Sequence, residues 1–253
     1  MVQKITEIYQ EYTEETLSKE LTLREVDYLL ENDLLSELND FAFFSLVNQG
    51  RNLADFYVLL QKAATVQKIT KRPVLVHLRV GDVSRESLPK FIDTVDNMQL
   101  RNFLIVSGDK RVNPDGFSSV EELLVAMKKA SDGRICLAAT VDPGRADASI
   151  KAKKRLTAGA DFLISQILFE IQPMVELRER LRQEEIDKEN VLVPGVLEKP
   201  SLGQLAWLQE HLQMKIPRTF QQQPKKSLAG LKQSLVENGF LGQHLFSVPE
   251  KND

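Results

Sequence analysis

Apolar residues gather in short runs along this chain, and each run stops at a small or polar residue. Runs of this length that are rich in Val, Ile, Leu and Phe are typical of strands buried on both faces. Seven of them predict strands: FAFFSLV (41–47), PVLVHLRVGD (73–82), FLIVSGDK (103–110), ICLAATVDPG (135–144), ADFLISQ (160–166), VLVPGVL (191–197) and LGQHLFSVP (241–249).

Segments with helical periodicity separate these strands. Leu88, Phe91, Ile92 and Val95, for example, follow the i, i+3, i+4, i+7 spacing that places side chains on one face of a helix. The same periodicity predicts further helices at 53–66, 120–127, 149–158, 173–186, 201–213 and 226–238. Strands that alternate with helices indicate a parallel sheet covered on both faces.

The first forty residues decide whether this sheet closes. The stretch 14–40 is typical of one or two acidic helices, and QKITEIY (3–9) is the candidate for an atypical eighth strand at the start of the chain. With that strand the pattern predicts an α/β fold of the (β/α)8 TIM-barrel type. Without it the sheet is open or the barrel is incomplete. We expect one barrel domain over residues 1–253, with an acidic helical segment at 1–40 and a truncated last helix.

Composition narrows the class of protein. A chain of 253 residues with 42% hydrophobic residues can bury a full core. The 33 Lys and Arg residues against 36 Asp and Glu residues argue against a nucleic-acid partner, which requires an excess of basic side chains. No apolar run approaches the roughly 20 residues of a membrane span. The one cysteine, Cys136, cannot form an internal disulfide, and we expect a cytoplasmic protein.

Four polar side chains fall near predicted strand ends: His77, Asp109, Thr140 and Gln166. Active sites of parallel α/β folds collect at the carboxyl ends of the strands. The Asp109 carboxylate suits either the stabilisation of a developing cation or the capping of the next loop. The Gln166 amide suits a heterocyclic ligand or a polar layer of the barrel. His77 is equally a ligand contact or a hydrogen-bonded core histidine.

Common cofactor and metal motifs are missing from the sequence. No strand is followed by G-x-G-x-x-G, and neither G-x-x-x-x-G-K-[ST] nor G-x-S-x-G occurs. The three histidines lack metal-ligand spacing, so no metal site is expected. Four basic residues between 151 and 155 follow the DPGRAD loop and form either a solvated helix face or a phosphate contact.

Three segments together resemble the methylenetetrahydrofolate reductase family: HLRVGDVSRESLPKFIDTVDNMQLRNFLIVSGDK, LAATVDPGRADASIKAKKRLTAGADFLISQILFE and VLVPGVL. They carry a His at the end of the third strand, G-D after the fourth, A-G-A leading to a Gln on the sixth, and P-G-V on the seventh. The order and spacing of these pieces are more specific than any one of them. The resemblance runs from about residue 41 to 200, with a weaker tail to 249. The family fold is a (β/α)8 barrel.

The resemblance implies an oxidoreductase of one-carbon metabolism and methionine biosynthesis. Family members bind FAD at the carboxyl ends of the strands and reduce it with NADH or NADPH. The flavin then passes hydride to 5,10-methylenetetrahydrofolate, which gives 5-methyltetrahydrofolate. Asp109 matches the acidic residue near flavin and folate that favours the cationic iminium form of the substrate. Gln166 matches the glutamine that contacts the folate or nicotinamide ring.

The same resemblance assigns further cofactor contacts and a general acid. His77, Gly108 and Thr140 match positions that contact the flavin, and Lys154 and Arg155 match basic residues near its phosphates. The first strand of the family carries a glutamate that acts as general acid.

Within ITEIYQEY, Glu7 takes the equivalent place of that glutamate, and Glu11 is a second candidate. Two departures from the family pattern are Ser107, where relatives have an arginine, and the short DPGRAD loop. They favour two alternatives: a flavin-free barrel that binds folate or transfers methyl groups, and a non-catalytic regulatory subunit. A folate is therefore the expected small-molecule partner. For assembly, the sequence leaves two alternatives, a homo-oligomer and a complex with a partner subunit.

Overall fold

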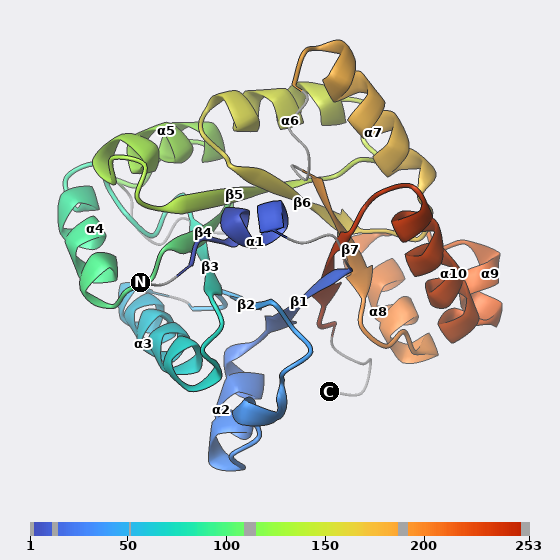
Figure 1. The fold of residues 1–253 in the computed structure, drawn as a ribbon, viewed down its shortest axis with the longest axis horizontal. Coiled ribbons are helices and arrows are strands. Elements are labelled where there is room, and N and C mark those ends of the chain that lie inside the picture. Colours follow the sequence, from blue (N-terminus) through green and yellow to red (C-terminus); the bar gives the residue numbers. More distant parts are fainter. Residues whose placement is uncertain (1–2, 12–14, 51, 109–114, 187–191, 249–253) are drawn as a thin grey trace.

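The strands of this protein close into a parallel barrel. The computed structural model describes residues 3–11, 15–50, 52–108, 115–186 and 192–248. Strands pair in sequence order from β1 to β8, and β8 returns to pair with β1, so that the ring is complete (Figure 1). The strands are β1 (Thr16–Leu21), β2 (Phe43–Leu46), β3 (Val74–Arg79), β4 (Asn102–Val106), β5 (Cys136–Val141), β6 (Phe162–Ile167), β7 (Leu192–Leu197) and β8 (Gly242–Phe246). The predicted (β/α)8 barrel is confirmed.

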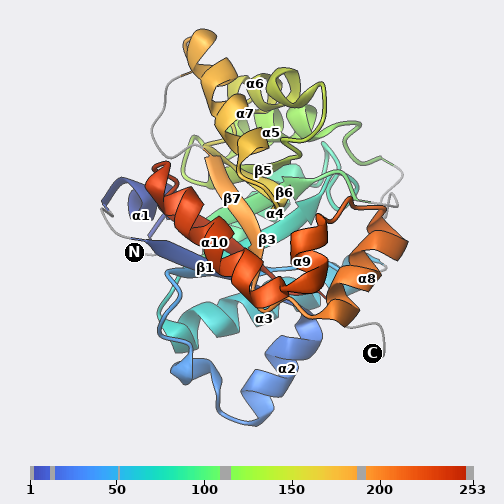
Figure 2. The same cartoon turned by 90° about the vertical axis from the view of Figure 1, so that its right-hand side faces the viewer.

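Helices connect successive strands and cover the outside of the barrel (Figure 1). They are α2 (Leu23–Glu31), α3 (Leu53–Thr70), α4 (Leu88–Asn97), α5 (Val120–Ala130), α6 (Ala148–Thr157), α7 (Gln172–Gln183), α8 (Leu202–Leu212), α9 (Arg218–Gln222) and α10 (Pro224–Glu237). The last three lie between β7 and β8 along the chain and side by side in the structure (Figure 2). They share a second core cluster with the ends of β6 and β7, Met174 of α7 and Leu245 of β8. Side-chain caps fix where several helices begin, as at Thr22 and Ser201, which both form capping boxes.

The first strand lies at Thr16–Leu21, and the strand predicted at 3–9 was wrong. Residues Ile5–Glu11 form helix α1 instead. The acidic stretch 14–40 therefore holds β1 as well as α2, rather than helices alone. The prediction missed β1 because this strand turns the polar side chains of Ser18 and Glu20 into the barrel interior. It therefore lacks the apolar run that marks the other strands.

Helix α1 closes one end of the barrel. Ile5, Ile8 and Tyr9 recur at helical spacing and are buried with the inward side chains of the strands. The Tyr9 ring packs edge-on against Phe43 and Phe162. The backbone N–H of Ile5 donates to Asn102 Oδ1 at 2.8 Å, at the first residue of β4. Helix α1 thus covers the amino-terminal ends of the strands. A ligand can therefore reach the barrel interior only from the carboxyl ends of the strands.

No helix follows β8 in the described residues, which end at 248. None of the helices in the described ranges combines the length and the apolar character that a bilayer crossing requires.

Candidate functional site

A cavity of about 930 Å³ lies at the carboxyl ends of β5 and β6. Ligand pockets of small molecules typically span roughly 300–1,000 Å³. We call it the mouth cavity. Thr140, Arg155 and Gln166, three residues that the sequence singled out, line it together. The segment 212–217, which joins α8 to α9, forms part of its wall.

The wall of the mouth cavity has a basic part and an apolar part. The cations are Arg145, Lys151, Arg155 and Lys215, and the apolar part includes Leu168, Phe169, Met214 and Ile216. Asp142 and Glu170 are the carboxylates among the lining residues that the structure describes. Cations outnumber carboxylates among the lining residues, although Arg145 and Lys151 both pair with Asp147 and Arg155 pairs with Glu121. An anionic ligand with an apolar or aromatic body suits the cavity if it shares these cations with the two carboxylates.

Gln166 reaches the cavity because β6 is irregular. The register of β6 against β7 shifts between Ile164 and Ile167, and Gln166 is the exposed residue of the strand. Ser165 stabilises this shift, since its Oγ donates to the Gln166 carbonyl at 2.7 Å and accepts from the Gly195 N–H at 2.8 Å. Irregularities of this kind re-aim side chains next to active sites.

Gly195 is required beside that irregular segment. A Cβ at Gly195 would lie 2.5 Å from the Ser165 carbonyl oxygen and would also meet the Phe246 ring. A larger residue would therefore push β6 and β7 apart where Gln166 is presented.

Arg155 and Thr140 are joined directly. The Arg155 guanidinium donates to the Thr140 carbonyl and also lies 3.4 Å from Glu121. Its side chain is only 14% exposed, so the charge is held in place rather than free in solvent. Lys154 is exposed on α6 and is not among the residues that line the mouth cavity.

A second polar group lies inside the barrel near the ends of β1 and β3. Glu20 Oε2 and His77 Nε2 lie 3.9 Å apart, and both side chains are about nine-tenths buried. His77 Nε2 also lies 2.8 Å from Ser45 Oγ. Burial raises the pKa of Glu20 to about 8, with the charge of Glu25 adding to the rise. Burial lowers the pKa of His77 to about 4. Both groups are therefore uncharged near neutral pH.

His244 on β8 continues this interior polar group. Its Nδ1 lies 2.9 Å from Ser18 Oγ, and the ring is fully buried. Burial, followed by repulsion from His77, lowers the pKa of His244 to about 3. Its Nε2 has no hydrogen-bond partner in the part of the chain that the structure describes.

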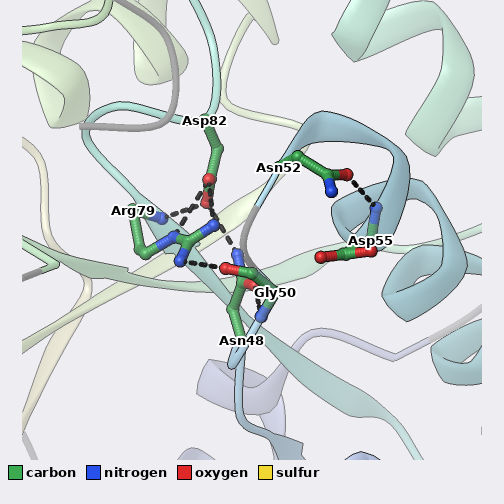
Figure 3. A network of polar contacts seen from close by, with 6 residues as sticks. All are labelled: Asn48, Gly50, Asn52, Asp55, Arg79 and Asp82. Carbon is green, nitrogen blue, oxygen red and sulfur yellow. Dashed lines mark hydrogen bonds and ion pairs between the residues drawn. The ribbon is translucent and has the colours of Figure 1, made fainter. Parts of the chain in front are cut away.

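A third arrangement ties together the loops that follow β2 and β3 (Figure 3). Arg79 Nε and Nη2 donate to Asp82 Oδ1 at 3.0 and 2.8 Å, and Nη1 donates to the Gly50 carbonyl at 2.6 Å. Asn48 Nδ2 donates to Asp82 Oδ2 at 2.7 Å. Burial raises the pKa of Asp82, and the hydrogen bonds and charge of Arg79 oppose that rise.

Arg79 also fills the space beside Gly108. Gly108 has φ +72°, and a Cβ there would lie 2.9 Å from Arg79 Cδ. The backbone of Gly108, which the resemblance assigns to flavin contact, thus packs against an arginine side chain of the same chain. His77, assigned to flavin as well, turns into the barrel toward Ser45 and Glu20.

The remaining predicted residues lie elsewhere. Glu7 is exposed on α1, at the end of the barrel opposite the mouth cavity, and Glu11 ends the same helix. Neither is on the first strand, which begins at Thr16, so neither takes the strand position that the resemblance implies for the glutamate. Asp109 falls outside the described residues, and its role stays a prediction.

Glu20 is the site residue that the sequence reasoning missed. It is the one glutamate on β1, and it is buried near the carboxyl end of that strand. Burial alternates with period two along TLSKEL, but the buried residues Thr16, Ser18 and Glu20 are polar, so the sequence alone carries no apolar alternation that marks this strand. The Thr22-x-x-Glu25 capping box, which marks the start of α2, also separates this strand from the helix.

A closed parallel barrel with a ligand-sized cavity at its carboxyl end defines the structural class of this protein, and the comparisons define the family. The methylenetetrahydrofolate reductase family model matches residues 33–232. The chain therefore belongs to the methylenetetrahydrofolate reductase family.

Curated relatives are distant. "Methylenetetrahydrofolate reductase 2" of Schizosaccharomyces pombe is 22% identical over 189 residues, which cover 66% of this chain and 30% of the relative. "5,10-methylenetetrahydrofolate reductase" of Pectobacterium carotovorum subsp. carotovorum is 27% identical over 161 residues, which cover 60% of this chain and 53% of that protein. The chain thus matches about a third to a half of the length of these relatives.

Solved structures support the fold. A 2,3-dimethylmalate lyase of the PEP mutase/isocitrate lyase superfamily superposes with a TM-score of 0.55 at 11% identity, over 94% of this chain and 86% of that one. Oxaloacetate acetylhydrolase, in complex with the product oxalate, superposes with a TM-score of 0.55 at 12% identity. The superposition covers 94% of this chain and 97% of that one. At these identities the likeness shows the barrel alone.

Proposed function

We propose that this protein is a methylenetetrahydrofolate reductase-type oxidoreductase, which reduces 5,10-methylenetetrahydrofolate to 5-methyltetrahydrofolate with FAD and NADH or NADPH. The observation that carries the proposal is the mouth cavity, where Thr140, Arg155 and Gln166 lie together at the carboxyl ends of β5 and β6. Membership of the family supports the choice of reaction.

The donor set of the mouth cavity fits a flavin nucleotide. Arg145, Lys151 and Arg155 would hold its phosphates by exchanging their present carboxylate partners, Asp147 and Glu121, for the pyrophosphate. The flavin supplies the hydride chemistry when bound, while the protein binds and orients the reactants. The apolar wall formed by Leu168 and Phe169 would help to keep water from the bound flavin.

Glu20 replaces Glu7 as our candidate for the general acid. Its carboxyl group keeps its proton up to a pH of about 8 because it is buried. A protonated carboxyl group inside an active site can donate that proton to a substrate nitrogen, as other buried carboxylic acids do. His77 lies beside Glu20, is held uncharged by burial and has its Nε2 bonded to Ser45 Oγ, so it would not draw the proton from the acid.

Gln166 is our candidate for the anchor of the pterin ring. An amide presents one donor and one acceptor in a plane and so matches the edge of a heterocycle. Its exposure at the mouth of the barrel leaves both groups available to a ligand. Asp109 would stabilise the cationic iminium form of the substrate from the loop after β4, as the resemblance implies.

One observation favours a second candidate function, a flavin-free barrel that binds folate or transfers methyl groups. Arg79 occupies the space next to Gly108, and His77 faces the barrel interior, so two of the expected flavin contacts are engaged within the chain. A folate in the mouth cavity would need neither of them. A regulatory subunit built on the same barrel is the third candidate.

The visible absorption spectrum of the purified protein, before and after added FAD, tests the proposal. A reductase shows bound flavin near about 450 nm that is bleached by NADH or NADPH and restored by methylenetetrahydrofolate. Failure to bind FAD at high concentration would overturn the reductase. Binding of a tetrahydrofolate by such a flavin-free protein would favour the second candidate, and the absence of folate binding would favour the regulatory subunit.

A further inference from the structure

The irregular segment of β6 holds an extra residue next to Gln166. Between the pairs Ile164–Val193 and Ile167–Gly195, the chain of β6 uses one residue more than the chain of β7. One extra residue in one of two paired strands is a β-bulge. Gln166 lies within this bulge and is the exposed residue of the strand.

We propose that Ser165 is a positioning residue for ligand binding, whose hydroxyl group fixes the bulge in the arrangement that presents Gln166 to the mouth cavity. The inference rests on the function proposed above, because Gln166 serves a ligand only if that cavity binds a folate. Ser165 itself is not among the residues that line the cavity, so it acts through Gln166 and not by contact with the ligand.

The Ser165 hydroxyl group takes the place of main-chain pairing inside the bulge. Its Oγ accepts from the Gly195 N–H at 2.8 Å and donates to the Gln166 carbonyl at 2.7 Å. In a regular parallel ladder, a backbone carbonyl of the neighbouring strand accepts from such an N–H. One hydroxyl group can do both because it offers a donor and two acceptor sites.

Main-chain pairing resumes directly after the bulge. The Leu168 N–H donates to the Gly195 carbonyl at 2.9 Å. The two backbone groups of Gly195 therefore have different partners, a side-chain hydroxyl group for the N–H and a main-chain N–H for the carbonyl. The irregularity is thus confined to the residues on which the direction of Gln166 depends.

Burial makes the hydroxyl group hard to replace by water. Ser165 is 1% exposed, and Gly195 is buried as well. A buried donor or acceptor that loses its partner is destabilising, so the backbone without this hydroxyl group favours another arrangement. Regular pairing of β6 with β7 is the nearest one, and a shift by one residue turns side chains to the opposite face. Gln166 would then no longer be presented to the mouth cavity.

A double-mutant cycle with tetrahydrofolate as the probe tests this role. Fluorescence titration of the full chain compares the unmodified protein with Ser165→Ala, Gln166→Leu and the double variant. Ser165→Ala should weaken tetrahydrofolate about fivefold or more. The double variant should bind within about twofold of Gln166→Leu alone, because the hydroxyl group has nothing to position once the amide is gone.

Three further variants complete the design. Ser165→Thr keeps the hydroxyl group and should bind tetrahydrofolate within about threefold of the unmodified protein. Ser131→Ala removes another fully buried hydroxyl group, at the end of α5 and outside the mouth cavity, and should leave the affinity unchanged. Thermal melting shows whether each variant is folded. If Ser165→Ala does not fold, Ser165→Cys, with its weaker donor and acceptor, takes its place in the cycle and should give a smaller loss with the same lack of additivity.

The outcomes separate this inference from the proposed function. Full affinity in Ser165→Ala overturns the positioning role, and so does a loss in Ser165→Thr as large as that in Ser165→Ala. A Ser165→Ala loss that persists in full in the Gln166→Leu background also overturns it, because the effect would then be a general one on the structure. If the unmodified protein does not bind tetrahydrofolate, or if Gln166→Leu binds it unchanged, the proposed role of Gln166 fails first and the inference fails with it.

Discussion

Glu20 and His77 face one another inside the barrel, with 3.9 Å between Oε2 and Nε2, and both are uncharged at neutral pH. The pair therefore differs from a surface ion pair, whose partners are both charged. Burial is the first cause of both pKa shifts, and it moves them in opposite directions because it disfavours the charged form of each group. Because the pKa of His77 lies below that of Glu20, the proton stays on the carboxyl group, from which a substrate could take it.

Glu20→Gln should reduce turnover by roughly 10²-fold or more, because the amide cannot donate the proton that the carboxyl group donates. In the unmodified protein, the rate of the folate half-reaction should fall as the pH rises through about 8, where Glu20 ionises. Stopped-flow measurement of flavin reoxidation across this pH range checks both statements. Glu31→Gln changes an exposed glutamate at the end of α2 and should leave the rate unchanged. An unaltered pH profile in Glu20→Gln would remove Glu20 from the mechanism.

Glu20 and His77 should also shape the dependence of stability on pH. The raised pKa of Glu20 stabilises the fold fully below about pH 4.5, and that contribution is lost as the pH rises to about 8. The lowered pKa of His77 stabilises the fold above about pH 6.5, and that contribution is lost as the pH falls to about 4.

Urea unfolding at pH 6 and pH 9 measures the Glu20 part of this dependence. The free energy of unfolding should drop between these pH values by at least about 1 kcal/mol more in the unmodified protein than in Glu20→Gln. Equal drops in the two proteins would show that Glu20 ionises with an ordinary pKa.

Gln166→Leu should weaken the binding of a tetrahydrofolate about tenfold or more, because an apolar side chain cannot pair with the polar edge of the pterin. Gln183→Leu provides the control, since Gln183 is an exposed glutamine at the end of α7. Fluorescence titration with tetrahydrofolate measures both. Unchanged affinity in Gln166→Leu would place the ligand away from β6.

Gly195→Ala should destabilise the protein by about 1–3 kcal/mol, because the new methyl group meets the Ser165 carbonyl and the Phe246 ring. Gly230→Ala is the matched change. Gly230 lies within α10 with open space around it, so alanine there should stabilise by roughly 0.5–1 kcal/mol. Thermal or urea unfolding of the two variants gives the comparison. Similar stabilities would mean that β6 and β7 separate easily at this point.

Arg79→Met should cost about 3–5 kcal/mol of unfolding free energy, because it leaves the fully buried Asp82 carboxylate without its cation. Arg180→Met removes one partner of an exposed pair with Glu176 and should change stability by less than about 1 kcal/mol. Chemical denaturation of the two variants tests the contrast. If Arg79→Met instead proves as stable as the unmodified protein, the loops after β2 and β3 do not depend on this interaction.

The sequence predicted β2 to β8 and the helices between them, apart from the short α9, because those strands are buried on both faces and keep continuous apolar runs. It failed at β1, where Ser18 and Glu20 turn inward and interrupt the run. It also failed at Ile5–Glu11, since a short apolar segment fits either a strand or a helix until its partners are known. For the same reason the sequence placed its candidate general acid, Glu7, on an expected strand that the structure shows as helix α1. Thr140 and Gln166 lie near the ends of strands that were easy to recognise, and with Arg155 of α6 they line one cavity, while their roles stay predictions.

Closure of the ring by β1 and β8 has a consequence for how the chain folds. Ser18 and His244, which touch across that seam, are 226 residues apart in the sequence. Contacts of such separation form slowly, because a long loop must first be ordered. While a ribosome is still extending the chain, β1 and β7 each keep an unpaired edge, and edges of this kind can recruit strands from another copy. We therefore expect synthesis of residues 242–246 to mark the point at which the nascent chain stops being prone to aggregation.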